Sequence, residues 1–454
     1  MPDDSQLPPA PVFARRFRIA EGARPMWLFF WAAATGCLAG LIAAAFQTCV
    51  SLLTTWRENL ADHFPAGGVL WWLVPVSFSA VSVALAVGLV RWLAPEAGGS
   101  GVQEIEGALD GLRPLRWQRV LPVKFFGGLL SLGSGLVLGR EGPTIQMGGN
   151  VGRMLADLFR LGPDDGHTLV AAGAGAGLSA AFNAPLAGIL FVIEEMRPQF
   201  KYSFLSVHSV LIATATADIV VRVLLGQDAD IRMVQLPAPP LASLWLFALL
   251  GVPFGVFGVV FNHLLLFMLD FFGKLSGGSH RASGLLLGAV VGALALVAPD
   301  AVGGGYHLIP RALEDSLPAA TLLLLFVARF GTTAFSYGSG APGGIFTPML
   351  ALATLFGMWS GHFAHEWFPA WVVHPQVFAV AGMGALFSAT VRAPLTGVAL
   401  SIEMTDNYTM ILPLILTCMV AAIVAQALGG RPIYSLLLAR TLKQDSGAPA
   451  RTSR

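Results

Sequence analysis

Long apolar runs alternate along the chain with short polar or glycine-rich interruptions. Nearly uninterrupted apolar runs recur from Met26 to about Ile433. Many of them reach the roughly 20 residues that a helix needs to cross the hydrocarbon core of a bilayer. The pattern predicts an all-α polytopic membrane protein.

Glycine and proline interrupt these apolar runs rather than collecting in loops. The chain contains 52 glycines and 29 prolines. Many helices should therefore be tilted, short or broken at membrane depth. Broken backbone is tolerated there where it is buried in protein or lines a polar cavity.

Two clusters of residues occur twice in the same order. The segment from Gly173 to Glu194 is matched 209 positions later by the segment from Gly382 to Glu403. A second cluster begins at Lys124 and is matched 205 positions later, from Arg329 onward. Repeated halves with helices interrupted at corresponding positions indicate a transporter whose site lies at the repeat interface. An old duplication without a site at that interface is the alternative.

The repeat suggests a division of the chain into two homologous halves. We expect a cytoplasmic N-terminal segment (1–25), a first repeat half (26–225), a polar linker (226–240), a second repeat half (241–440) and a cytoplasmic tail (441–454).

The composition is typical of a membrane protein and does not suggest a nucleic-acid partner. The chain is 55% apolar and 12% charged, and its formal net charge is +1. No basic stripe suggests nucleic acid as a partner. Basic residues precede the first apolar run and follow the last one, so both termini should be cytoplasmic. These residues are Arg15, Arg16, Arg18 and Arg24, then Arg431, Arg440, Lys443, Arg451 and Arg454.

Four short stretches could direct backbone N–H groups into the protein interior. They are residues 99–103, 139–143 and 344–348 and the region of Tyr434. Glycine lets the backbone approach closely, and proline suits a first helical turn. Each stretch is a candidate helix N-terminus, where free N–H groups and the helix dipole favour an anion. Close helix packing is the alternative for any one glycine stretch alone.

Acidic residues also lie inside apolar regions. Glu141 interrupts a glycine-rich apolar stretch, and an ionisable residue at membrane depth indicates an ion pathway or proton relay by default. Glu194 and Glu195 end an apolar run, and Glu403 holds the equivalent place in the second half. We interpret Glu194 and Glu403 as helix caps, because their repeat-related positions suggest a shared structural role.

Other chemistries find little support. His362 and His365 do not form the His-Glu-x-x-His zinc motif, and no glycine run contains the Gly-Lys-Ser/Thr of a nucleotide-binding loop. We therefore expect no metal, no nucleotide and no cofactor, and no enzymatic activity. A membrane-embedded hydrolase that uses Glu141 and Glu195 as an acid/base pair is a remaining alternative, but the chain has no Gly-x-Ser-x-Gly nucleophile motif.

Three of the stretches resemble the selectivity-filter motifs of the CLC family of chloride channels and chloride/proton exchangers, and most closely its bacterial exchangers. They read Gly-Ser-Gly-Val-Gln, Gly-Arg-Glu-Gly-Pro and Gly-Ile-Phe-Thr-Pro. The implied filter residues are Gly99, Ser100, Gly101, Val102, Gln103, Gly139, Arg140, Glu141, Gly142, Pro143, Gly344, Ile345, Phe346, Thr347 and Pro348.

The resemblance implies a homodimer in a bacterial plasma (inner) membrane, with lipid around it. Each subunit would have its own anion pathway and would be built from two inverted-topology repeat halves. Chloride would lie between the hydroxyls of Ser100 and Tyr434 and the N–H groups of Ile345 and Phe346. Glu141 would be the external gate and proton acceptor. Glu195 would transfer protons on the internal side, with Lys124 and Glu106 expected near it.

Two details refine the expected activity. The first motif usually ends in proline, and here Gln103 takes that place, which frees φ and adds an N–H group. Ser100 is retained, which favours chloride among anions. An acid at position 195 accompanies exchangers within the family, so we expect a chloride/proton antiporter. A passive chloride channel with the same fold is the alternative.

Overall fold

The computed structural model describes residues 24–196, 199–227, 231, 233, 235–275, 277–314 and 317–446. Over these residues the chain is α-helical with short 3-10 turns and no strand, which confirms the all-α prediction. The helices of the first part are α2 (Arg24–Glu58), α3 (Val69–Leu93), α4 (Val102–Leu109), α5 (Trp117–Gly133), α6 (Glu141–Leu158), α7 (Pro163–Phe182), α8 (Pro185–Glu194) and α9 (Phe204–Leu225). Those of the second part are α10 (Leu244–Gly273), α11 (Gly277–Val297), α12 (Leu308–Leu313), α13 (Ala319–Gly338), α14 (Phe346–Trp367), α15 (Gln376–Val391), α16 (Pro394–Thr405), α17 (Ile411–Ala427) and α18 (Ile433–Ser446).

Helix length varies widely. Within the described residues, six helices are long and apolar enough to cross a membrane: α2, α3, α9, α10, α13 and α17. By contrast, α8 has 10 residues and α16 has 12. At 1.5 Å per residue, helices of this size reach only about half of the roughly 30 Å hydrocarbon core. Neither helix can cross the core by itself, as expected for the short or broken helices predicted from glycine and proline.

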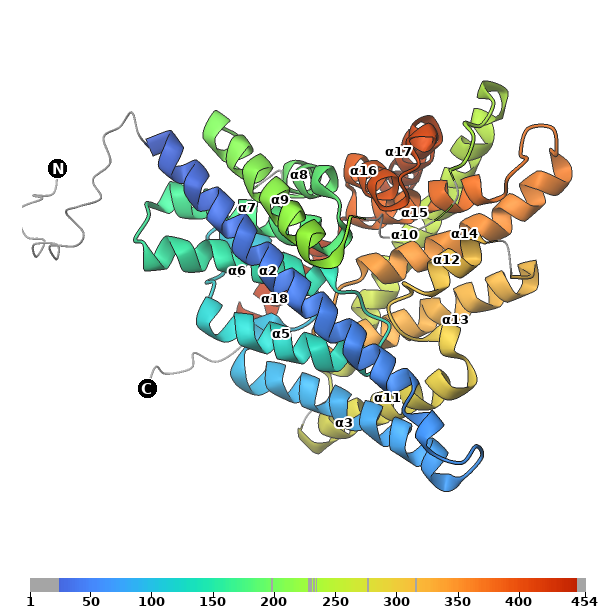
Figure 1. Ribbon diagram of the computed structural model, residues 1–454, viewed down its shortest axis with the longest axis horizontal. Helices are drawn as coiled ribbons and strands as arrows, with labels where there is room; N and C mark the ends of the chain where they lie inside the picture. The colour runs from blue at the N-terminus through green and yellow to red at the C-terminus, as the bar shows by residue number, and fades with distance from the viewer. Residues whose placement is uncertain are drawn as a thin grey trace, which may run out of the picture.

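The order of helices repeats. The series α5 to α9 has the same order and similar lengths as the series α13 to α17. In Figure 1 the first series lies mainly on the left and the second on the right, and the short helices α8 and α16 pack together between them. Helix α18 then crosses back to pack on α4 in the first part.

The limits of the two halves stay a prediction. Helix α9 ends at Leu225 and the next helical turn begins at Leu241. The predicted N-terminal segment lies almost wholly outside the described residues. The last eight residues of the predicted tail and part of the predicted linker also lie outside them.

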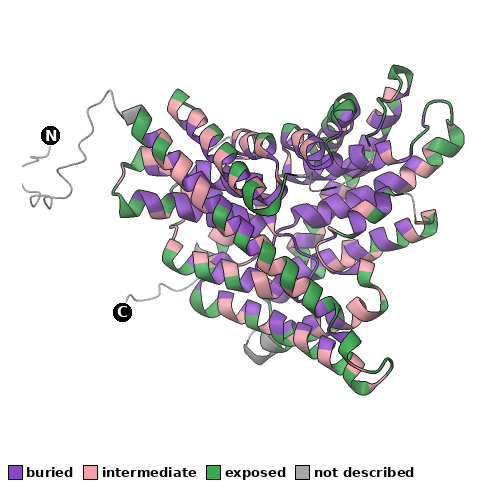
Figure 2. Cartoon of the chain, in the orientation of Figure 1, coloured by how far each residue is buried: buried purple, intermediate pink, exposed green. Residues whose placement is uncertain are grey.

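The core lies where α6, α7, α14 and α15 meet. Figure 2 shows buried residues concentrated in these central helices and exposed ones on the outward faces of the peripheral helices. Glycines outside the four candidate stretches allow close packing of these helices. A Cβ on Gly148 of α6 would overlap the carbonyl oxygen of Gly173 on α7, and the converse is also true. Backbones in direct contact of this kind are typical of membrane helices.

Candidate anion and proton site

Three of the glycine stretches meet in the interior although they are far apart in the chain. Gly139 and Gly344 exchange two backbone hydrogen bonds, with N···O distances of 2.9 and 2.7 Å. A Cβ on Gly142 would lie 2.9 Å from the Cα atoms of both Gly344 and Ser100. The prediction that residues 99–103, 139–143 and 344–348 converge is therefore confirmed.

Four helices begin at this meeting point. Helix α4 starts at Val102, α6 at Glu141, α14 at Phe346 and α18 at Ile433. The first-turn N–H groups of a helix have no partner within the helix and carry its positive dipole end. The site therefore gathers partial positive charge from several helix ends.

The start of α4 depends on a left-handed glycine. Gly101 has φ of 83° and precedes the first helical residue. A Cβ at Gly101 would overlap the side chain of Gln146, so both backbone conformation and space require glycine. Gln103 is the second residue of the helix, a first-turn position that also accepts proline.

Glu141 is fully buried and its carboxylate lies on the N-terminus of α14. The Phe346 N–H donates to Oε1 at 2.7 Å, and the Thr347 N–H lies 3.4 Å from the same oxygen. The Thr347 hydroxyl donates to Oε2 at 3.0 Å. An anionic side chain thus occupies the donors that would suit a free anion.

Two buried hydroxyls face this carboxylate. Ser100 and Tyr434 are both 0% exposed, and neither Ser100 Oγ nor Tyr434 Oη has a hydrogen-bond partner. The Tyr434 hydroxyl has Tyr337, Ser100, Glu141 and Glu195 as its electrostatic neighbours. Buried polar groups are rarely left without a partner in native structures. The pair therefore offers two neutral donors to a small ligand.

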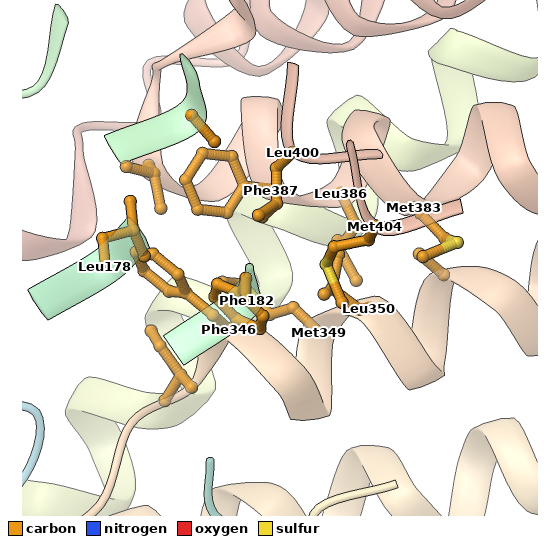
Figure 3. Packing of buried hydrophobic residues seen from close by; sticks show 14 of the residues in the cluster. Leu178, Phe182, Phe346, Met349, Leu350, Met383, Leu386, Phe387, Leu400 and Met404 are labelled. Carbon is orange, nitrogen blue, oxygen red and sulfur yellow. The ribbon is translucent and has the colours of Figure 1, made fainter. Parts of the chain in front are cut away.

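An aromatic cluster fixes the first residue of α14. The Phe346 ring packs against Phe387 at a centroid distance of 4.7 Å, Phe191 at 5.9 Å and Phe182 at 6.4 Å. It also lies 6.0 Å from the ring of Tyr434. Figure 3 shows Phe346 between Phe182 and Phe387, within the core where α7, α14 and α15 meet. The amide that donates to Glu141 is therefore held on a rigid support.

Glu195 follows α8 and lies next to another acid. Its carboxyl group interacts with that of Glu106 on α4, which is 2% exposed. The expectation that Glu106 lies near Glu195 is confirmed. The Lys124 ammonium group donates to the carbonyls of Ala97 and Gly99 at 3.0 and 2.7 Å, and its expected place near Glu195 stays a prediction.

Glu194 and Glu403 cap helix ends, as interpreted from the repeat, but each caps a helix of the other half. Glu403 of α16 accepts from the N–H groups of Leu186 and Ala187 at the start of α8, at 2.9 and 2.8 Å. Glu194 of α8 accepts from the N–H groups of residues 395 and 396 at the start of α16, at 3.0 and 2.8 Å. The two short helices are thus joined by crossed carboxylates.

A cavity of about 550 Å³ lies beside the segment that precedes α6. Its lining includes Arg57, Arg140 and Tyr306. The Arg140 guanidinium lies 4.2 Å from the centroid of the Tyr306 ring, and the Tyr306 hydroxyl contacts Thr347. Sequence reasoning did not identify Tyr306, which lies in no recognisable motif. In the described part of the chain, no group of three or more His, Cys, Asp or Glu side chains could hold a metal ion.

The fold and this site define a polytopic helical membrane protein in which helix N-termini hold an anionic group. A family model described as voltage gated chloride channel matches residues 81–426. The chain therefore belongs to the CLC family.

Individual relatives agree with this assignment. The chain is 53% identical over 431 residues to the H(+)/Cl(-) exchange transporter ClcA of Vibrio cholerae, covering 94% of this chain and 92% of that protein. The transporter of the same name from Cronobacter sakazakii is 52% identical, with 94% and 93% covered. The solved structure of a slow cyanobacterial Cl−/H+ antiporter is 45% identical with a TM-score of 0.90, covering 92% of this chain and 99% of that chain. A CLC-type fluoride/proton antiporter, 20% identical with a TM-score of 0.74, shares the fold.

Proposed function

We propose that this protein exchanges chloride for protons across a bacterial plasma membrane. The observation that carries the proposal is the Glu141 carboxylate on the N-terminus of α14, where it occupies an anion's place and can also take up a proton. Close relatives are named H(+)/Cl(-) exchange transporters, which supports the same function. Ion gradients alone drive such an exchange, without a nucleotide or cofactor.

Chloride binds between the Ser100 and Tyr434 hydroxyls and the N–H groups of Ile345 and Phe346. The two hydroxyls support this role because they are buried without a partner. Several partial charges bind an anion more weakly than one full charge would, which allows the ion to leave again.

Glu141 couples the two ions by competing with chloride. When ionised, its carboxylate occupies the N–H groups that would otherwise hold chloride. When protonated, it is neutral, loses its attraction for the helix ends and can move away. Because chloride and the ionised carboxylate exclude one another, proton binding favours chloride binding, and by linkage the reverse also holds.

Protons pass to the cytoplasmic side through Glu195. Its contact with Glu106 supports this role, because two adjacent carboxyl groups can pass a proton between them. This route leaves the chloride path at Glu195. Both termini then face the cytoplasm, as the basic residues flanking the apolar runs indicate.

The protein is a homodimer. The short helices α8 and α16 end at membrane depth, and their capping carboxylates, Glu194 and Glu403, are only partly buried. Beside them, Leu186 and Leu395 are each 53% exposed. Ionisable groups in contact with lipid are costly. A second copy that covers this face would shield them, since the adjoining surface is apolar.

Purified protein in liposomes tests the function directly. An outward chloride gradient should drive proton uptake that a pH electrode records, and uptake should stop when the gradient is removed. Under combined chloride and pH gradients, the reversal potential of an exchanger follows both ions. A potential that ignores pH would instead establish the alternative, a passive chloride channel.

A further inference from the structure

The gate carboxylate is held by a side chain as well as by backbone. Thr347 Oγ1 lies 3.0 Å from Glu141 Oε2 and also 3.0 Å from Tyr306 Oη. A hydroxyl group has a single proton. When Thr347 donates to the carboxylate, it must therefore accept from Tyr306, and the two hydroxyls form a directed chain that ends on Glu141.

The outer member of this chain is fixed in place. Arg140 lies over the ring of Tyr306 at 4.2 Å, and its Nε donates to the carbonyl of Ala181 at 3.0 Å. Tyr306 also lines the cavity of about 550 Å³. The chain of hydroxyls therefore runs from this cavity to the buried carboxylate.

The Glu141 carboxylate is closely surrounded by backbone, so few other groups can reach it. A Cβ on either Gly139 or Gly344 would overlap the Glu141 carboxyl group, so the backbone encloses it on both sides. Among the described residues of α18, Tyr434 is the ionisable residue that interacts with Glu141. The buried cations of α5 and α13, Lys124 and Arg329, donate to backbone carbonyls instead.

We propose that Thr347 and Tyr306 form a latch that stabilises ionised Glu141 in its occluding position and thereby sets the external pH at which exchange is half-maximal. Hydrogen bonds to charged acceptors are stronger than those between neutral groups, so the Thr347 bond favours the ionised form. This inference rests on the proposed exchange function and assigns a positioning role to two residues outside the proposed chloride site.

The test compares Thr347→Val with wild type in liposomes, with turnover recorded against external pH. Valine keeps the shape of threonine and removes the donor, so the gate should be protonated more easily. The pH of half-maximal turnover should rise by roughly one unit, the equivalent of one hydrogen bond to a charged group. Tyr306→Phe keeps the ring under Arg140 and should shift the profile less, in the same direction.

Two further variants separate the latch from a general effect on folding. Thr347→Ser restores the hydroxyl and should return the profile toward that of wild type. Thr354→Val removes a buried hydroxyl from the same helix, one that bonds only the carbonyl of Leu350 at 2.8 Å, and should leave the profile unchanged.

The outcomes are distinguishable. An unchanged pH profile in both Thr347→Val and Tyr306→Phe would overturn the latch. If Thr347→Val does not fold, the profile of Tyr306→Phe alone decides whether the latch exists. If wild type carries chloride without protons, the proposed exchange fails. The pH dependence of chloride current in the same variants then still decides whether the latch exists.

Discussion

In the first half of the molecule, α6 begins with Glu141, and in the second half, α14 begins with Phe346 at the equivalent position 205 residues later. The first places an ionisable side chain at the helix start, and the second places an aromatic ring. The Glu141 carboxylate accepts a hydrogen bond from the amide of that same Phe346. One half therefore supplies the acid and the other supplies the donors and a rigid apolar support.

The structural residues, by contrast, have the same role in both halves. Lys124 of α5 and Arg329 of α13 are equivalent, and both are fully buried cations that bind carbonyls just before a short helix. Glu194 and Glu403 are equivalent too, and they cap one another's helices. The acid at 195, by contrast, has Met404 at its equivalent position. The repeat preserves the structural residues, and the acids of the proposed proton route occur in one half.

The largest effect is expected from Glu141→Gln, which removes the acid from the start of α6. Glutamine keeps a carbonyl acceptor but cannot ionise. Chloride should still cross the membrane, whereas chloride-driven proton uptake in liposomes should fall to background. Proton uptake that persists in this variant would remove Glu141 from the coupling mechanism.

The next comparison pairs Glu195→Gln with Met404→Leu. The first should abolish or nearly abolish proton uptake while chloride flux continues, because the internal acid is gone. The second changes the equivalent buried position with little change in volume, and such replacements usually cost under about 1.5 kcal/mol. Proton uptake should therefore survive in Met404→Leu. Equal proton uptake in the two variants would contradict an asymmetric proton route.

The smallest difference between equivalent residues is expected for the stability of Arg329→Met and Lys124→Met. Both variants should be less stable than wild type. Arg329 donates to three carbonyls and Lys124 to two. Each buried carbonyl left without a donor costs about 1–3 kcal/mol. Both variants should lower the thermal unfolding midpoint in detergent, Arg329→Met more than Lys124→Met. A larger loss for Lys124→Met would show that the two cations are not equivalent anchors.

Much of the site could be predicted from short motifs, because glycine and proline at fixed spacing determine where a helix begins. This is why residues 99–103, 139–143 and 344–348 were expected to converge. The capping role of Glu194 and Glu403 could also be inferred from their equivalent positions. Which helix each one caps could not, since that depends on how the two halves pack.

Side-chain partners across the fold were harder to predict. The carbonyls of Ala97 and Gly99 that accept from the Lys124 ammonium group were not predicted. The contact of Thr347 with Tyr306 was missed altogether. Tyr306 follows several glycines in a short connection before α12, and no periodicity marks which way its side chain points.

The crossed carboxylates of α8 and α16 have a consequence for motion. Moving the halves apart would break the hydrogen bonds between Glu194, Glu403 and the four amides they bind. Rocking of one half against the other, which many carriers use, would therefore be expensive in this molecule. Rotation of individual side chains at the helix tips is far cheaper, so the scaffold can stay closed during every cycle while a few torsion angles change.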